Sequence, residues 1–140
     1  ADEDFRDDQI DAGEIGADHQ VTAIYDVVLR DRLPISQPIA QVKLRAKPPG
    51  PDRPAEEWDT SFPAGLVRPS WEVASRDLRA AWTLAQAADK LRGAELAVEV
   101  PWARLSTEAA TLEDEGFPRA KEIRTQVDQA AVLSGGLATR

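Results

Sequence analysis

The sequence predicts an α+β fold, in which a short antiparallel β segment of two to four strands precedes a three-helix C-terminal subdomain. Residues 39–47 alternate between apolar and polar side chains, which is the period of a half-exposed strand. From about Ser75 onward, apolar side chains instead recur at helical spacing. We therefore expect a β-rich junction segment over residues 1–70, with an acidic lead-in and a Pro-rich loop, and a helical subdomain over residues 71–140.

The first predicted strand is Gln20–Leu29, which follows an acidic lead-in over residues 1–18. It is rich in β-branched and aromatic residues and is apolar on both faces, which is typical of a strand buried on both faces. Its predicted antiparallel neighbour is Ile39–Lys47, because the connection between them is too short for a crossover helix. Because two or three strands are marginal alone, we expect Gln20–Leu29 to pair further with residues 55–70, with upstream sequence or with another subunit.

A proline-rich loop, Pro48–Pro54, interrupts the pattern, since proline cannot belong to a central strand or a helix interior. After it, residues 55–69 carry Trp58 and Phe62 without a clear period. They predict either a short strand or an irregular segment packed on the core.

Three helices are predicted in the second half of the chain. The first begins at Ser75 or Asp77 as N-cap and ends at Gly93. The second begins near Pro101 and ends at Gly116, and the third runs from near Pro118 to before Gly135. The predicted apolar stripes are Leu78, Ala81, Trp82, Ala85, Ala88 and Leu91, then Trp102, Leu105, Ala109 and Leu112, then Ala120, Ile123, Val127 and Ala130 or Ala131.

The composition argues against several classes of function. The formal net charge is −8 and the basic residues are scattered, which argues against binding to nucleic acid or, by charge alone, to an anionic membrane. The absence of cysteine excludes a thiol nucleophile, a disulfide framework and Cys-based metal sites. No apolar run approaches the roughly 20 residues that span a bilayer. The chain also lacks methionine, so we expect it to be cut or processed from a longer one.

The sequence contains no catalytic, cofactor-binding or metal-binding constellation. His19 is the single histidine and has no second ligand at metal-binding spacing, so a structural or solvated role is favoured. The acidic residues of the lead-in lack the order of a calcium loop, which favours a solvated charge run. The candidate ligands considered for such a loop are Asp7, Asp8, Asp11 and Glu14. No serine lies in a Gly-x-Ser-x-Gly motif.

The four tryptophans are the most informative side chains for binding. Trp82 and Trp102 lie on apolar helical stripes and are predicted core residues. For Trp58 and Trp71 the sequence does not decide between packing in the core and forming an exposed aromatic patch. They are therefore the candidate partner-binding residues.

One stretch of the sequence resembles a known family. Glu3–Asp26, with Asp-Ala-Gly-Glu-Ile-Gly-Ala at its centre, is similar to the junction after the metal-binding module in bacterial von Willebrand factor type A domain proteins of the YfbK-like group. Val42–Pro49 resembles a second strand of that group, and Leu78–Gly93 and the helix after Gly116-Phe117 resemble it more loosely. Asp18 stands where the family has glycine. Because glycine is the residue that adopts tight-turn conformations most readily, this difference argues against a tight turn at this position.

The resemblance implies the C-terminal region of a von Willebrand factor A-domain protein of the bacterial cell envelope. In that family the Mg²⁺ site belongs to the A domain, and its Asp-x-Ser-x-Ser motif is absent from these residues. We therefore expect a non-catalytic structural or protein-interaction region without a cofactor, in an extracytoplasmic compartment. Its expected partner is a protein or the upstream part of the same polypeptide. The alternative is a stand-alone small acidic enzyme or regulator with a site built from carboxylates and tryptophans.

Overall fold

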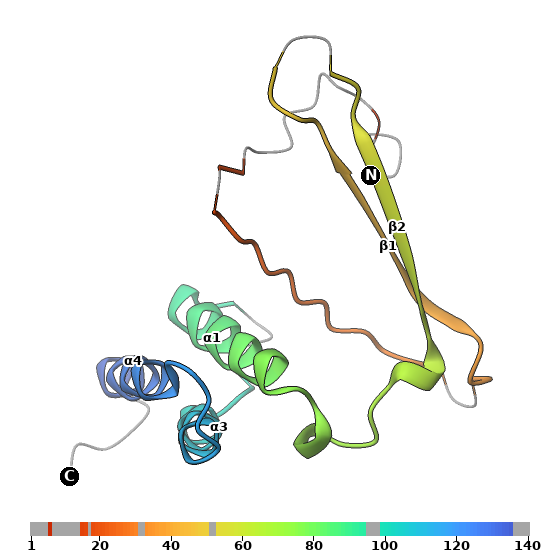
Figure 1. Cartoon of the computed structure of the whole chain (residues 1–140). Coiled ribbons are helices and arrows are strands. Elements are labelled where there is room, and N and C mark those ends of the chain that lie inside the picture. Colours follow the sequence, from red (N-terminus) through yellow and green to blue (C-terminus); the bar gives the residue numbers. More distant parts are fainter. Residues whose placement is uncertain are drawn as a thin grey trace. The chain divides into compact units, whose positions relative to one another are not determined.

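The computed structural model describes residues 6, 15–16, 18–30, 33–50, 53–94 and 99–135. These residues form a two-stranded antiparallel sheet followed by three α-helices, which confirms the predicted α+β class (Figure 1). The chain divides into two compact units, one around the β-hairpin and one around the helices. Each unit has its own packing and is described separately. The acidic lead-in residues Asp7, Asp8, Asp11 and Glu14 lie outside the described residues.

The sheet is a hairpin of β1 (Pro38–Ala46) and β2 (Glu56–Pro63). β1 agrees with the strand predicted from the alternation of residues 39–47, and the Pro-rich segment connects the two strands. Leu44 pairs with Trp58 and Lys43 pairs with Asp59, so apolar residues face apolar residues and opposite charges face each other. This complementarity explains why residues 56–63 form the second strand, although their sequence lacks a clear period.

The strand predicted over Gln20–Leu29 is wrong, and so is its pairing with Ile39–Lys47. Residues 19–30 form neither strand nor helix, and the partner of β1 is β2. The predicted burial on both faces is wrong as well, since the Val28 side chain is 97% exposed. The physical reason is that Gln20–Leu29 lacks the alternating acids with which β2 faces Lys43 and Arg45.

A short 3-10 helix, η2 (Ala64–Leu66), follows β2 and closes the base of the hairpin. The Gly65 N–H donates to the Ile35 carbonyl at 2.8 Å, and the Ala64 N–H donates to the Gln37 carbonyl at 2.8 Å. A Cβ atom at Gly65 would lie 2.5 Å from Ile35 Cγ2, so glycine permits this close approach.

The helical unit begins with a second 3-10 helix, η3 (Trp71–Val73), and contains α1 (Arg76–Arg92), α3 (Trp102–Asp114) and α4 (Ala120–Leu133). The local signals read from the sequence determine the ends of these helices. Ser75 Oγ accepts the Leu78 N–H at 3.2 Å as the predicted N-cap, and Gly93 ends α1 with φ of 72°. The three predicted helices are confirmed.

Large side chains of α3 and α4 and small side chains of α1 form the core of this unit. Trp102 is buried as predicted, and Trp82 is half-buried against the core. The buried core residues are Ala80, Ala87, Trp102, Leu105, Ala109, Leu112, Ala120, Ile123, Val127 and Ala131. Alanine on α1 lets this helix approach its neighbours closely.

The predicted apolar stripe of α1 coincides only partly with its buried face: Trp82 packs against the core, and Ala81 and Ala85 are half-buried. The buried residues of α1 are instead Arg79, Ala80, Thr83 and Ala87, and the predicted stripe residues Leu78 and Leu91 are exposed. Polar residues tolerate this burial because they have partners: Arg79 forms ion pairs with Glu108 and Glu115, and Thr83 Oγ1 donates to the Arg79 carbonyl at 2.8 Å. Hydrophobic periodicity alone cannot reveal a face that is chosen by long-range ion pairs.

Candidate interaction site

The most unusual feature of the described residues is a strand-like sequence without a strand partner. Residues 19–30 run as an extended trace between the turn at Asp18 and the start of the hairpin (Figure 1). Several of their large apolar side chains are exposed, namely Val21, Tyr25, Val27, Val28 and Leu29. Backbone and side chains in this segment are thus available for pairing.

The segment begins at a tight turn. The His19 N–H donates to the Gly16 carbonyl at 3.2 Å, and Asp18 adopts a left-handed φ of 64°. Aspartate is one of the few residues other than glycine that visits this region readily. The turn therefore forms although Asp18 replaces the glycine that is usual in the resembling family.

At its other end, the segment borders a shallow pocket of about 270 Å³. The lining residues are mostly apolar and come from the segment and from the start of β1: Val27, Val28, Leu29, Arg30, Leu33, Gln37, Pro38 and Ile39. The pocket continues the apolar surface that the segment exposes.

The hairpin exposes a second apolar surface. Directly opposite residues of antiparallel strands share a face, so Ala40, Val42 and Leu44 lie beside Phe62, Thr60 and Trp58. Trp58, a predicted candidate for partner binding, is 51% exposed on this face. We call the set Val42, Leu44, Trp58 and Phe62 the hairpin face. No strand covers either outer edge of the hairpin among the described residues.

The opposite face of the hairpin is polar and internally paired. Arg6 donates to both carboxylate oxygens of Glu57, at 3.0 and 2.8 Å, and Gln41 donates to Asp59 at 3.2 Å. The hydrogen bond from Arg6 lowers the pKa of Glu57 below its usual range, and the charges of Arg6, Arg45 and Lys43 act in the same direction.

Trp71, the other predicted candidate, already has partners inside the helical unit. Its indole N–H donates to Glu108 Oε2 at 2.6 Å, and its ring meets that of Trp82 edge-on at 4.8 Å. Arg79 forms ion pairs with both Glu108 and Glu115, and Arg104 lies over the Trp82 ring. Two carboxylates and two tryptophans are brought together here, but the guanidinium of Arg79 neutralises both carboxylates.

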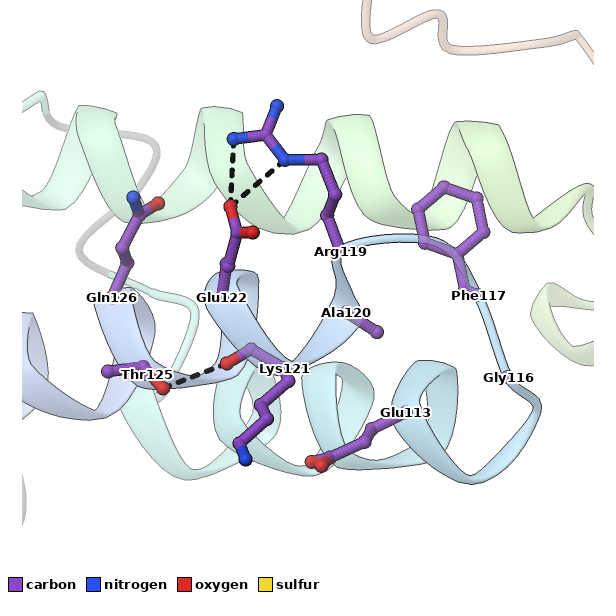
Figure 2. Close-up of a pocket in the computed structure, with 9 residues that line it drawn as sticks. All are labelled: Glu113, Gly116, Phe117, Arg119, Ala120, Lys121, Glu122, Thr125 and Gln126. Atoms are coloured by element: carbon purple, nitrogen blue, oxygen red, sulfur yellow. Dashed lines mark hydrogen bonds and ion pairs between the residues drawn. The ribbon is translucent and has the colours of Figure 1, made fainter.

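An open pocket of about 590 Å³ lies at the turn between α3 and α4 (Figure 2). Arg119 Nε and Nη2 both donate to Glu122 Oε2, at 2.9 and 2.8 Å, so these charged side chains satisfy each other across the pocket wall (Figure 2). Arg124 likewise pairs with Glu113 at 3.0 Å. The charged side chains of the pocket are paired with one another, so they do not form a cluster of one charge that would select a ligand.

The described residues contain no group of three or more His, Cys, Asp or Glu side chains that could hold a metal ion. Within the same residues, none of the helices has the length and apolar content needed to cross a membrane.

Sequence reasoning named Trp58 and Trp71 but missed the ion-paired cluster around Arg79. A signal was present in the helical spacing, since Glu108 and Glu115 are two turns apart on one side of α3 and its C-terminal end. Their common partner on α1, however, can be identified only from the packing of the two helices.

Comparison with known proteins adds one finding. Residues 1–36 match the family model described as "Uncharacterized protein YfbK, C-terminal". No curated protein and no solved structure shows significant similarity to the chain. The match includes the turn at Asp18 and the whole unpaired segment, and it confirms the resemblance predicted for the N-terminal residues. The match covers 36 of the 140 residues, so the similarity to the YfbK C-terminal family is found in this N-terminal part of the chain.

Proposed function

We propose that this chain is a non-catalytic interaction region of a larger YfbK-family polypeptide, and that Gln20–Leu29 adds a strand to a sheet in the preceding part of that polypeptide. The single observation that carries the proposal is the exposed, unpaired state of this strand-like segment. An extended peptide that joins a sheet edge gains a ladder of main-chain hydrogen bonds, and alternate side chains enter pockets on the two faces.

The choice of the preceding part as partner rests on the family description. The matched model is described as the C-terminal part of YfbK, and it includes the unpaired segment itself. In such a protein the segment follows directly after the preceding region, so a short chain path favours pairing within one polypeptide. The resemblance implies that this preceding region is a von Willebrand factor type A domain, with its Mg²⁺, in a cell-envelope protein.

The hairpin face is the second contact that we propose for the same partner. A two-stranded hairpin is marginal by itself, and its apolar face is too exposed to stabilise it alone. Packing Leu44 and Trp58 against the partner would bury this surface. The aromatic ring of Trp58 makes it the expected anchor of the contact.

The alternative, an acidic enzyme with a carboxylate and tryptophan site, gains no support from the cluster around Trp71. Its carboxylates Glu108 and Glu115 both form ion pairs with Arg79, so they are already engaged within the helical unit. The cluster instead stabilises the contact between α1 and α3.

The test is a binding measurement between this chain and a separately produced preceding region of a YfbK-family protein. Val27→Pro removes a main-chain donor and disfavours a paired strand, whereas Val27→Thr at the same position keeps the donor and the β propensity. We expect the Pro variant to lose most of the binding and the Thr variant to retain it. Because residue 27 belongs to no helix or strand, both variants should unfold like the parent chain. Equal binding by the two variants would contradict strand addition.

A further inference from the structure

The start of β1 lies beside the end of the unpaired segment. The chain between them turns back on itself, because the Gln37 N–H donates to the Pro34 carbonyl at 2.9 Å. Residues 27–30 and residues 37–39 line one pocket of about 270 Å³, and both stretches belong to the same compact unit. A turn of this kind joins strands that run antiparallel side by side. The segment therefore has a short path to the outer edge of β1.

The turn indicates a register in which the segment and β1 complement each other. If Pro34 stands opposite Gln37, each step back along the segment matches one step forward along β1. Apolar residues then stand opposite apolar residues, on the side of the hairpin face. All of these side chains are exposed in the structure. The opposing residues are Leu29 with Val42, Val27 with Leu44, and Tyr25 with Ala46.

The same register matches a charge on the polar side of β1. Asp26 stands opposite Arg45, which lies opposite Glu57 in the hairpin and pairs with it at 3.7 Å. A guanidinium has several donors, so Arg45 can serve one carboxylate on each side. A slip by one residue would remove this match, because Asp26 would face Ala46 and Val27 would face Arg45. The side chains therefore favour the register that the turn indicates.

We propose that the docked segment Gln20–Leu29 pairs through one edge with the preceding region and through its other edge with β1. The inference rests on the proposed function, since docking brings the segment into a sheet, and it adds the outer edge of β1 as the second neighbour. The hairpin then continues the partner's sheet, in the order partner strand, Gln20–Leu29, β1 and β2. Such a sheet has more strands than a hairpin, which is marginal alone.

The pairing with β1 depends on the partner for a physical reason. Without it, the segment would lose backbone entropy while its apolar side chains stayed in water beside the exposed hairpin face. A partner that covers the hairpin face would also cover Val27 and Tyr25, and this burial offsets the lost entropy. The segment is accordingly unpaired in the chain by itself.

Disulfide trapping tests the register, because the chain contains no cysteine of its own. Val27→Cys with Leu44→Cys places two thiols directly opposite each other, whereas Val28→Cys with Leu44→Cys places them on opposite faces of the sheet. Transient pairing in the isolated chain should oxidise the first double variant at least about threefold faster than the second. Equal rates, or faster oxidation of the Val28 double variant, would overturn the register.

Binding of the preceding region of a YfbK-family protein tests whether the two pairings occur together. The oxidised Val27→Cys, Leu44→Cys chain holds the segment against β1 in advance, so it should bind about tenfold tighter than the same chain after reduction. Equal or weaker binding of the oxidised chain would overturn the pairing with β1 and leave strand addition itself intact. Failure of the parent chain to bind would instead contradict the proposed function, and the oxidation rates of the isolated chain would still decide the pairing with β1.

Discussion

The indole N–H of Trp71 donates to Glu108 Oε2 at 2.6 Å, which fastens the segment before α1 onto α3. Glu108 also faces Arg79, so a single carboxylate joins η3, α1 and α3. The contact defines where the helical unit begins and gives Trp71 a structural role within this chain.

Removal of the Trp71 donor should destabilise the helical unit. Trp71→Phe keeps most of the ring contact with Trp82 but leaves the Glu108 oxygen without its hydrogen bond. We expect a loss of about 1–2 kcal/mol in the free energy of unfolding, measured with urea. Trp58→Phe is the control, since Trp58 is exposed on the hairpin, and it should change this value by less than about 0.5 kcal/mol. Equal losses in both variants would contradict the role of the hydrogen bond.

Replacement of Arg79 should cost more, because its side chain is buried between two carboxylates. Arg79→Met keeps the length of the side chain but leaves Glu108 and Glu115 without their cation. We expect a loss of about 3 kcal/mol in the unfolding free energy. Arg124→Met removes an exposed ion pair with Glu113 and should leave the unfolding midpoint nearly unchanged. The prediction fails if Arg79→Met unfolds at the same urea concentration as the parent.

Truncation of a core leucine should identify the contact between α3 and its neighbours as the centre of the helical unit. Leu105 has no exposed surface, and Leu105→Ala should lower the unfolding free energy by about 2–5 kcal/mol. Leu78→Ala removes the same atoms from an exposed position on α1 and should cost less than about 1 kcal/mol. Thermal unfolding followed by circular dichroism at helical wavelengths provides the comparison, and similar losses would contradict the assigned core.

The pairing of Arg6 with Glu57 predicts a pH dependence in the hairpin. Because the hydrogen bond from Arg6 lowers the pKa of Glu57 in the folded chain, the pairing contributes stability above the unfolded pKa of a glutamate. That contribution is lost as the pH falls through the lowered folded value. In Arg6→Ala, the Glu57 pKa measured by carboxyl NMR titration should rise toward the ordinary value. Lys43→Ala should raise it less, because Lys43 acts only through its charge. A larger rise in Lys43→Ala would contradict this order.

The parts of the fold that depend on local chemistry could be predicted from the sequence. Ser75 and Gly93 delimit α1 because capping needs only the residues at the ends of a helix. The alternation of residues 39–47 likewise located β1. The parts that depend on long-range partners could not be predicted: two of them differ from expectation, and a third was left open.

Gln20–Leu29 has strong β propensity, but propensity describes what a segment can form and not which strand it meets. The sequence did not decide whether residues 55–69 form a strand. The apolar residues Trp58 and Phe62 of β2 lie among acidic residues, and these acids favour a strand only because they pair with Lys43 and Arg45 of β1. The buried face of α1 was predicted as the apolar stripe from Leu78 to Leu91, because hydrophobic periodicity does not reveal the ion pairs that Arg79 forms with Glu108 and Glu115.

Hydrogen exchange of the backbone amides over Gln20–Leu29 tests the central claim most directly. In the isolated chain these amides lack strand pairing and should exchange close to the rate of an unstructured peptide. In complex with the preceding region of a YfbK-family protein, alternate amides should become protected, as expected for a strand at a sheet edge. Amides that still exchange rapidly in a formed complex would contradict the claim that this segment is the docking strand.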